Sequence, residues 1–581
     1  MKRYMFILVL IILFVSCWDS DVQKESELPP YMKIRTARNK VEDSGNMTDN
    51  PGLAKEELLR ILQELEELTD KFYTFYNVQQ IEVEYMNLFR CLAQTCAEQD
   101  SQKDAVFYLQ KAVYWGLSTK SIERNEVFKI LRDHPEFQKI MNQARANDQF
   151  WDSEIWQTPF REDMTMPEKI AGISRFWSEV KYNFSNFDLV PSLDWDALYV
   201  EYLSRIIRTK STYEYFLVLQ EMCAKLNDSH TNVYPPEEIS NDYYGRPAIK
   251  TVYIEDRIFI VDIYDEELMK KGIEPGMEIS EIDRQPVDQY VEENVIPYLS
   301  SSTHQDLMIR AYEYFLFTGC KGKSEITLTL INERNKISRC KLKRLPYDEY
   351  LKVRRPRKTF EFKILPGKIA YIALRSFSDP EILKEFQNTF AAIKDSKALI
   401  IDIRDNGGGD SWNGYNILKY LSDKPFQTSR AQTRVYRPII RVRTRDAAVN
   451  SGIFDALEII PHVDPQKLYK NPVIVLSGAR TFSAAEDFLV AFKLMNRGKI
   501  IGGKTGGSTG QPLFFKLPGG CRARVCVKRD QFPDGKDFVG MGIIPDIEEH
   551  QTTNDFRRGR DTVLETALKY IRAELNEGER K

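Results

Sequence analysis

Residues 398–410 read Ala-Leu-Ile-Ile-Asp-Ile-Arg-Asp-Asn-Gly-Gly-Gly-Asp, an apolar run that ends in a polar, glycine-rich stretch. The apolar run predicts a strand buried on both faces, and residues 368–374 and 472–476 predict two more strands of this kind. Segments 381–393 and 484–495, which follow two of these strands, are expected to be helices. Continuous apolar strands that alternate with helices favour a partly parallel α/β sheet in this part of the chain.

A smaller, β-rich module is predicted upstream, over residues 245–350. The stretch 271–287, Lys-Gly-Ile-Glu-Pro-Gly-Met-Glu-Ile-Ser-Glu-Ile-Asp-Arg-Gln-Pro-Val, resembles the core of a PDZ domain, in which a turn joins two strands. Such domains bind the C-terminus of a polypeptide by adding it to their sheet as a strand. A long insert at residues 290–314 departs from a compact PDZ unit and contains His304 in a Ser/Thr-rich loop.

Two helical regions precede this module. Residues 160–238 predict helices that end before Pro235-Pro236, since proline stops a helix. In the region 55–150, the segment 85–118 resembles one tetratricopeptide-type hairpin, with small alanines where two helices would approach closely. A convincing repeat array needs about three units. A helical spacer and a module that binds a protein partner are therefore both open interpretations.

The first segment predicts an export signal. Met1-Lys-Arg is followed by an apolar stretch over residues 4–15, shorter than the roughly 20 residues of a membrane-spanning helix. It ends in Phe14-Val-Ser-Cys17, which resembles a bacterial lipoprotein box, where the cysteine becomes the lipid-modified N-terminus. The alternative is a plain signal peptide with an incidental cysteine. Residues 17–54 are rich in Asp, Glu, Ser, Asn and Pro, and we expect them to form a tether.

The composition of the chain excludes several classes of protein. The 581 residues carry 82 Lys and Arg against 85 Asp and Glu, a net charge of −3, which argues against a nucleic-acid partner. An apolar content of 42% with 29% charged residues excludes bulk disorder and a polytopic membrane protein. The cysteine spacing predicts neither a zinc site nor a disulfide framework. Cys521 and Cys526 could pair across a hairpin, but buried free thiols are favoured, and no metal or cofactor is expected.

A candidate nucleophile stands in Leu476-Ser-Gly-Ala-Arg-Thr-Phe-Ser483-Ala-Ala-Glu-Asp, where a strand leads through a small-residue turn into a helix. Ser483 would lie at the positive end of that helix, and the Ala484 N–H could bind a developing oxyanion. The logic is that of a nucleophile elbow, although the Gly-x-Ser-x-Gly pattern is absent. Taken alone, Ser483 is at least as well explained as a helix cap.

Five histidines are available if the chemistry needs an imidazole. His230 follows a polar Asn-Asp-Ser run at a helix end, which is an unusual place for a buried structural histidine. The other four lie in segments without a catalytic motif: His134, His304, His462 and His550. The three glycines at 407–409 permit a tight turn with presented N–H groups, but no Gly-Lys-Ser/Thr follows, so this is not a P-loop.

Three motifs taken together resemble the tail-specific, or C-terminal processing, serine peptidases of family S41. They are Asp402-Ile-Arg-Asp-Asn-Gly-Gly-Gly, Thr481-Phe-Ser-Ala-Ala-Glu486 and Gly542-Ile-Ile-Pro-Asp546. The resemblance covers about residues 165–550. With the segments above, it implies a multidomain α+β chain: signal peptide 1–16, tether 17–54, tetratricopeptide-like helices 55–150, S41 helical domain 160–238, PDZ-like module 245–350 and α/β catalytic core 358–575, of the crotonase-like or ClpP-like type.

The resemblance also separates two catalytic branches. One branch has a Ser/Lys dyad, but the slot of its lysine holds Ser508 here, and Lys504 lies on the wrong side of the turn. The chain is therefore more similar to the tricorn and retinoid-binding-protein branch. There, Ser229-His230 matches the Ser-His pair and Ser483 the nucleophile.

The acid of this branch has no direct counterpart at the expected position of this sequence. A Glu is expected where this chain has Val539, and Asp537, just before it, is the substitute that we predict. Three alternatives stay open. Ser229 could connect His230 to an acid elsewhere, the enzyme could work with a weaker orienting group, or the protein could be inactive.

The implied reaction is acyl transfer, with His230 as general base for Ser483 and the Gly408 and Ala484 N–H groups as oxyanion donors. The leading hypothesis is a serine endopeptidase, anchored at the cell envelope through lipid on Cys17, that acts on exported or envelope polypeptides. One alternative is an inactive peptide-binding or scaffold lipoprotein on the same fold. The other is a carbohydrate-handling lipoprotein, for which no acidic pair with an obvious role is present.

Overall fold

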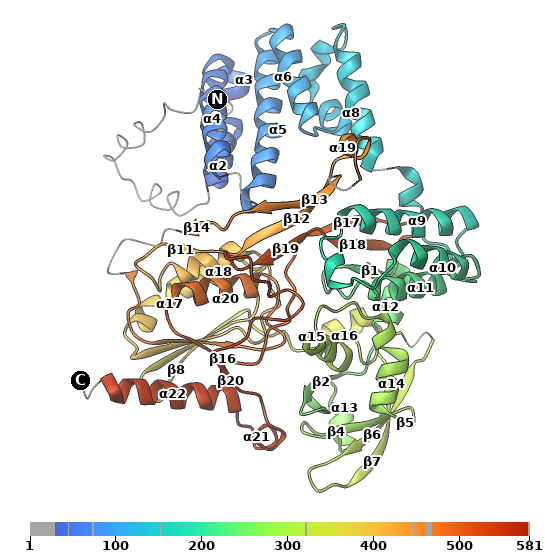
Figure 1. Ribbon diagram of the computed structural model, residues 1–581, viewed down its shortest axis with the longest axis vertical. Helices are drawn as coiled ribbons and strands as arrows, with labels where there is room; N and C mark the ends of the chain where they lie inside the picture. Colours follow the sequence, from blue (N-terminus) through green and yellow to red (C-terminus); the bar gives the residue numbers. More distant parts are fainter. Residues whose placement is uncertain are drawn as a thin grey trace. The chain divides into compact units, whose positions relative to one another are not determined.

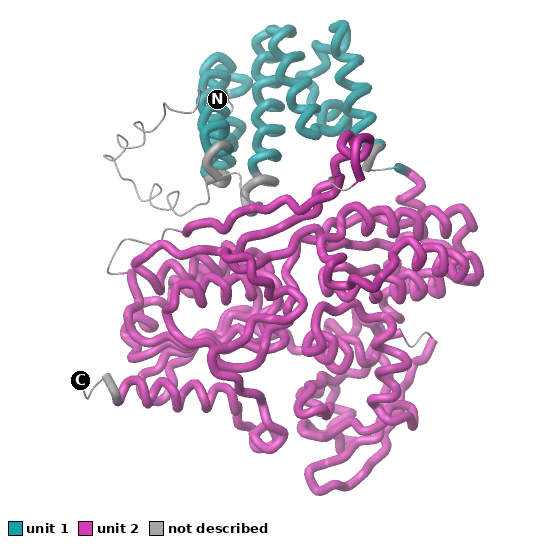
Figure 2. The backbone as a smooth tube through the Cα atoms, viewed as in Figure 1, with its two compact units in different colours: residues 1–153 teal, residues 154–581 magenta. Residues whose placement is uncertain are grey.

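The computed structural model describes residues 30–43, 46–72, 75–151, 153–319, 322–445, 448–459 and 467–578. The chain divides into two compact units, residues 1–153 and 154–581 (Figure 2). The predicted signal peptide, Cys17 and His462 lie outside the described residues. Within the described ranges, no helix combines the length and apolar character needed to cross a membrane.

The first unit is helical, as the sequence predicts for residues 55–150. Its elements are α2 (Pro30–Asp43), α3 (Asn46–Asp49), α4 (Pro51–Phe72), α5 (Phe75–Glu98), α6 (Gln102–Tyr114), α7 (Thr119–Arg124), η1 (Glu126–Leu131) and α8 (Phe137–Trp151). Ala93, Ala105 and Ala112 are fully buried where α5 packs on α6. The tetratricopeptide likeness itself stays a prediction.

The predicted tether over residues 17–54 is wrong from residue 30 onward, because α2, α3 and the start of α4 occupy that part. The polar composition conceals a helical stripe, since Ile34 and Val41 lie two turns apart on one buried face of α2. Between them, Arg38 Nε lies 2.9 Å from Oε2 of Glu84, a fully buried carboxylate on α5. Packing against α5, which composition does not reveal, makes this segment helical.

The second unit begins with the predicted helical region. Its helices are α9 (Met166–Asn183), α10 (Trp195–Ile207) and α11 (Thr212–Ala224), and the chain then enters β1 (Asn232–Tyr234). β1 pairs antiparallel with β18 (Arg522–Cys526), which also pairs with β17 (Pro512–Lys516). This pairing brings the segment around His230 beside the C-terminal part of the chain.

An antiparallel sheet of six strands forms the next module, with five strands in one row and the short β5 (Gln285–Pro286) paired outside that row (Figure 1). Its order is β2-β3-β4-β6-β7, with β2 (Ile249–Ile254), β3 (Arg257–Ile263), β4 (Glu278–Ile282), β6 (Glu325–Ile331) and β7 (Ile337–Lys343). Gly272 and Gly276 adopt φ of +80° and +90° in the turn before β4, which explains the glycines of the predicted PDZ-like turn. The insert forms η4 (Ile296–Tyr298), α15 (His304–Ile309) and η5 (Arg310–Tyr314), after α14 (Val287–Asn294). The PDZ identity stays a prediction.

The C-terminal core contains a six-stranded sheet in the order β20-β16-β15-β10-β9-β8. Its strands are β8 (Phe360–Leu365), β9 (Ile369–Leu374), β10 (Ala398–Asp402), β15 (Val473–Ser477), β16 (Lys499–Gly502) and β20 (Ile547–Glu548). All neighbours are parallel except β8 and β9, as the alternating pattern predicts. Every residue of β9, β10 and β15 is buried.

Helices cover both faces of this sheet. Figure 1 shows α17 (Glu381–Lys394), α18 (Ser411–Leu418) and α20 (Ala484–Met495) on one side and α22 (Thr562–Gly578) on the other. A second, three-stranded sheet joins β19 (Lys528–Gln531) to β12 (Arg430–Tyr436) and β13 (Val449–Phe454). Shorter elements fill the connections: α12 (Glu237–Tyr243), α13 (Glu266–Lys270), α16 (Tyr347–Val353), α19 (Pro438–Arg441) and α21 (Thr553–Arg557). Because parallel strands end at one edge, the loops after β10, β15 and β16 meet there.

Candidate active site

Ser483 occupies a sharp turn between the carboxyl end of β15 and the start of α20. Its backbone angles are φ +57° and ψ −124°, a conformation that is costly for a residue with a side chain. Hydrogen bonds stabilise this strained conformation: the Ser483 N–H donates to Glu486 Oε2 at 3.1 Å and to the Ser508 carbonyl at 3.2 Å. The predicted strand-turn-helix geometry is therefore present around Ser483.

His230 lies between two serine hydroxyls. Its Nε2 is 3.2 Å from Ser483 Oγ, and its Nδ1 is 2.9 Å from Ser508 Oγ. The imidazole is buried and stacks on Phe482, with ring centroids 4.8 Å apart and an interplanar angle of 11°. When Nδ1 carries the proton and donates to Ser508, Nε2 is free to accept from Ser483. The ring is thus positioned to act as a base toward Ser483.

The electrostatic environment keeps this imidazole neutral. Burial lowers the pKa of His230 well below its usual value, and the positive charges of Arg524, Arg310 and Lys528 lower it further. A neutral ring at physiological pH has the lone pair that a general base needs.

Glu486 joins the nucleophile to the loop after β16. Its buried carboxylate accepts from Thr505 Oγ1 at 2.5 Å, from the Gly507 N–H at 2.9 Å and from the Ser508 N–H at 3.0 Å. It also accepts from Ser483, as described above. Burial raises the pKa of Glu486 to about 7, although its hydrogen bonds act in the opposite direction. Glu486 ends the sequence motif that begins at Thr481, but the motif alone does not indicate this role.

Asp537, the predicted acid, does not reach His230. Its Oδ1 accepts from Gln531 Nε2 at 2.7 Å and lies 3.4 Å from Arg529 Nε. Spacing in the sequence suggested Asp537, but its carboxylate binds side chains of β19 and not His230. The group that orients the imidazole is the Ser508 hydroxyl, at the slot where the other branch carries its lysine.

Ser229 turns away from the ring of its neighbour and donates to Asp306 Oδ2 at 2.5 Å. The same carboxylate oxygen accepts from Ser301 Oγ at 2.6 Å and from Arg310 Nε at 2.7 Å. The Arg310 guanidinium in turn lies 5.5 Å from the centroid of the Phe482 ring, on which His230 stacks. Asp306 therefore binds both the residue that precedes His230 and the arginine that lies over Phe482. It is the partner of Ser229 that sequence reasoning could not place, because the insert has no motif.

The two predicted oxyanion donors, Gly408 and Ala484, differ in whether their N–H groups already have a hydrogen-bond partner. A methyl group on Gly408 would lie 2.7 Å from Ser483 Cβ, so this glycine backbone packs directly on the nucleophile. The Gly408 N–H, however, donates to Asn406 Oδ1 at 2.9 Å. Ala484 is the first residue of α20, where an N–H has no partner inside its own helix. Ala484 is the more direct candidate, and Gly408 must exchange partners before it can serve.

The remaining candidates lie apart from this centre. Lys504 is exposed. His134 accepts from the Glu136 N–H in the first unit, and the His550 imidazole lies 3.2 Å from Glu548. Cys521 and Cys526 are buried and free, as favoured, and they bracket one extended strand, too far apart for a bridge. Among the described residues, no cluster of His, Cys, Asp or Glu has the composition of a metal site.

Two family models match parts of this chain. Residues 368–549 match the model of peptidase family S41, and residues 174–224 match the tricorn protease C1 domain. Residues 368–549 form a peptidase family S41 domain. This S41 domain supplies Ser483, Ser508 and Glu486, whereas His230 follows the tricorn C1 match. The recognition made from the three sequence motifs is confirmed at this level.

Curated relatives include both branches. The chain is 22% identical over 415 residues to a tricorn protease homolog of Saccharolobus solfataricus, a match that covers 69% of this chain and 34% of that protein. It is 29% identical over 183 residues to a carboxyl-terminal-processing protease of Picosynechococcus, covering 31% and 38%. The chain thus spans about a third of the length of these relatives. Among solved structures, mature CPAF in complex with lactacystin aligns with a TM-score of 0.55 at 16% identity, covering 68% of this chain and 95% of that one, which supports the fold.

Proposed function

We propose that the chain is a serine endopeptidase in which Ser483 attacks a peptide carbonyl and His230 acts as its general base. The observation that carries this proposal is the 3.2 Å contact between Ser483 Oγ and His230 Nε2, made by a serine in a strained turn after a parallel strand. A serine that only caps a helix has no need of that backbone conformation, since the extended backbone of Thr165, Ser211 and Thr303 serves the caps of other helices in this chain.

The reaction follows from the contacts. As Ser483 Oγ attacks the carbonyl carbon, its proton passes to His230 Nε2, and the Nδ1–H of the imidazolium donates to Ser508. The oxyanion forms beside Ala484, whose N–H lies at the positive end of α20. His230 then protonates the leaving amine. Water, deprotonated by the same nitrogen, releases the acyl group from Ser483.

The orienting group in this proposal is a hydroxyl, not a carboxylate. Ser508 fixes the tautomer and the ring plane, but it brings no negative charge to stabilise the imidazolium. The neighbouring Asp228 supports the backbone instead, since its Oδ1 accepts from the His230 N–H at 3.0 Å and from Thr231 Oγ1 at 2.8 Å. This is the weaker orienting group among the alternatives that the sequence left open.

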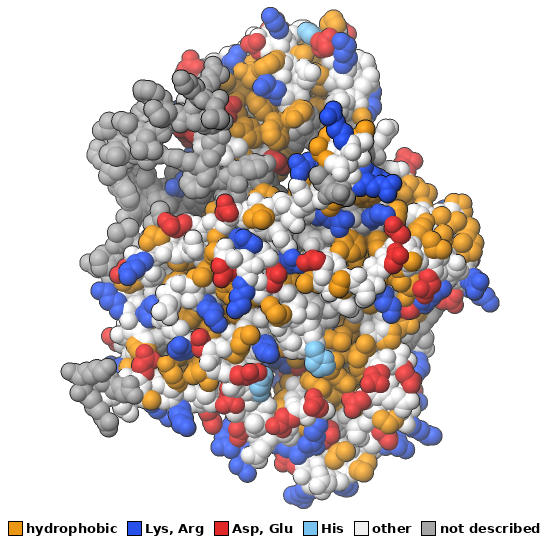
Figure 3. All heavy atoms as spheres, viewed as in Figure 1, with side chains coloured by type: hydrophobic (Ala, Val, Ile, Leu, Met, Phe, Trp, Pro, Cys, Tyr) orange, Lys and Arg blue, Asp and Glu red, His pale blue; other side chains and the backbone are white. Residues whose placement is uncertain are grey.

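The proposed substrates are exported or envelope polypeptides, with the protein held at the cell envelope by lipid on Cys17. The match of residues 368–549 to peptidase family S41 supports a polypeptide substrate, and the predicted signal peptide supports export. On the face of the second unit shown in Figure 3, acidic and basic side chains are interspersed. Such a surface does not resemble the basic stripe of a nucleic-acid partner.

The test is cleavage of an unstructured protein such as casein by the purified chain and three variants. Wild type and Lys504→Ala should cleave at similar rates, whereas Ser483→Ala and His230→Ala should not cleave. Cleavage that survives in Ser483→Ala would refute the nucleophile. Loss of cleavage in Lys504→Ala but not in His230→Ala would instead assign the Ser/Lys branch. A wild type that binds the protein without cutting it would favour the inactive scaffold.

A further inference from the structure

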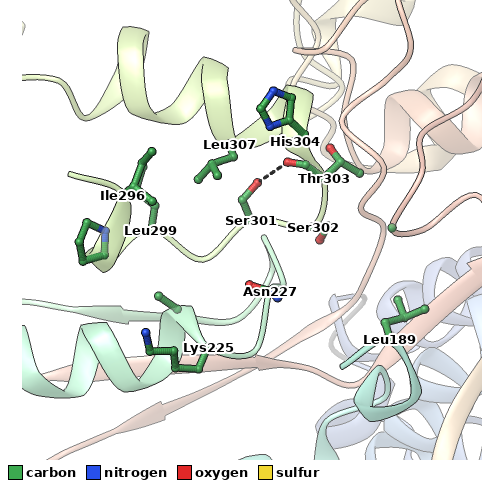
Figure 4. Close-up of a pocket in the computed structure, with 13 residues that line it drawn as sticks. Leu189, Lys225, Asn227, Ile296, Leu299, Ser301, Ser302, Thr303, His304 and Leu307 are labelled. Atoms are coloured by element: carbon green, nitrogen blue, oxygen red, sulfur yellow. Dashed lines mark hydrogen bonds between the residues drawn. The ribbon is translucent and has the colours of Figure 1, made fainter. Parts of the chain in front are cut away.

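A cavity of about 590 Å³ opens in the second unit between the C-terminal end of α11, the insert and Gly540 (Figure 4). This volume lies within the range of roughly 300–1,000 Å³ that is typical of small-ligand sites. In Figure 4, His304 and Leu307 on α15 face Lys225 and Asn227 across the open space. None of the catalytic groups described above lines the cavity.

The lining has two kinds of surface. Apolar side chains form much of it: Leu189, Ile296, Pro297, Leu299 and Leu307. Polar groups converge on the rest: Lys225, Asn227, Ser301, Ser302, Thr303 and His304. The lining contains no Asp or Glu, so Lys225 gives the cavity a net positive charge. Lys225 is exposed to solvent and interacts electrostatically with Glu221 on α11, although no ion pair joins it to a carboxylate within the described parts of the chain.

We propose that this cavity binds an organic carboxylate with an apolar body. The ammonium of Lys225 pairs with the carboxylate, helped by the hydroxyls of the insert, and the aliphatic wall takes the body. A small free acid and the C-terminal residue of a polypeptide share this chemistry. Binding of the small acid is independent of the proposed function, whereas the polypeptide source rests on it.

The cavity wall is bonded to both catalytic loops. The Ser302 N–H donates to Ser229 Oγ at 2.8 Å, next to His230. Thr303 Oγ1 donates to the Gly506 carbonyl at 2.8 Å, and the Gly540 N–H donates to the Gly507 carbonyl at 2.8 Å, next to Ser508. A ligand on this wall therefore lies beside the reaction centre, at a site distinct from the strand edges that a PDZ-like module offers.

The experiment measures binding to the full chain carrying Ser483→Ala, so that no probe is consumed. The probes are hexanoate and the peptide Ala-Ala-Ala-Leu with a free carboxyl end, each compared with its amide by calorimetry. We expect the carboxylates to bind at least roughly tenfold more tightly than the amides. Lys225→Met should remove that preference, and Lys210→Met, an exposed lysine outside the cavity, should not.

Each outcome is decisive. Binding of hexanoate supports a small acid as the source, and binding of the free-acid peptide alone supports a polypeptide end. No binding of either carboxylate, or a preference for carboxylate that persists in Lys225→Met, would overturn the proposal. Casein cleavage by the wild-type chain separates the two claims. Cleavage by wild type together with no carboxylate binding to Ser483→Ala sinks only the cavity proposal, and carboxylate binding to Ser483→Ala without cleavage by wild type sinks only the peptidase.

Discussion

At the scale of single residues, the reaction centre consists of one imidazole held by neutral partners. His230 contacts Ser483 and Ser508 through its nitrogens and Phe482 through its face. Two carboxylates act on His230 only indirectly: Glu486 binds the Ser508 N–H, and Asp306 binds the Ser229 hydroxyl. The two carboxylates therefore control where the reacting groups lie, and each can be tested by a change that removes charge while keeping shape.

The pH profile should identify Glu486. Glu486 and His230 both act in their deprotonated forms, so activity falls as pH falls, and the group with the higher pKa is protonated first. Burial raises the pKa of Glu486 to about 7 and lowers that of His230, so the acid limb of kcat/KM should lie near pH 7. Glu486→Gln should lower the rate and move the limb to more acidic pH. A limb that stays near pH 7 in this variant would contradict the assignment.

Asp306 is predicted to be a positioning residue. Asp306→Asn keeps the shape but weakens the bonds to Ser229 and Arg310, so His230 loses alignment. We expect kcat to fall by up to roughly a hundredfold with little change in KM. Asp262→Asn serves as control and should keep wild-type kinetics, because this half-buried carboxylate of the same module lies 3.8 Å from the exposed Arg355. A change confined to KM, or equal losses in both variants, would argue against positioning.

Sequence reasoning reached some of these residues and not others. Ser483 and His230 were found because motifs surround them. Ser508 was noticed only as the place of a missing lysine, since nothing local indicates that a serine will face a histidine 278 residues earlier in the chain. Asp537 was chosen by spacing from one signature, and Asp306 lies in an insert that follows no pattern. Long-range contacts between unmarked segments decide such roles.

At the scale of elements, the glycine loop after β10 tolerates side chains at some positions only. Gly408→Ala would place a methyl group 2.7 Å from Ser483 Cβ at a φ of +96°, so this variant should lose at least roughly a hundredfold in activity. Gly407→Ala meets nothing within 4 Å and should stay active. Kinetics and circular dichroism of both variants check this. Equal activity of the two would contradict the close packing of Gly408 on the nucleophile.

The same scale shows which elements a sequence can predict. The strands β9, β10 and β15 are buried on both faces, and their continuous apolar runs predicted them directly. Helix α2 was missed, because its apolar stripe is sparse and its stability depends on contacts with α5. The pairing of β1 with β18, which carries His230 to the S41 domain, joins two short strands whose register no local pattern specifies.

At the scale of the whole molecule, the proposed anchor depends on a single atom, the Cys17 sulfur. Lipid attached there would supply the membrane binding that we propose. In cells that express the full chain, Cys17→Ser should move the protein from the membrane fraction to the soluble fraction, as followed by immunoblot. Casein cleavage by the released protein serves as the control for folding. Unchanged retention in the membrane fraction would refute the lipoprotein hypothesis.

The central claim is that His230 activates Ser483, and the rate of fluorophosphonate labelling measures this most directly. Mass spectrometry of the labelled full chain should place the adduct on Ser483. Labelling should slow by roughly a hundredfold or more in His230→Ala and disappear from that position in Ser483→Ala. An adduct on another residue, or labelling of His230→Ala at the wild-type rate, would contradict the account.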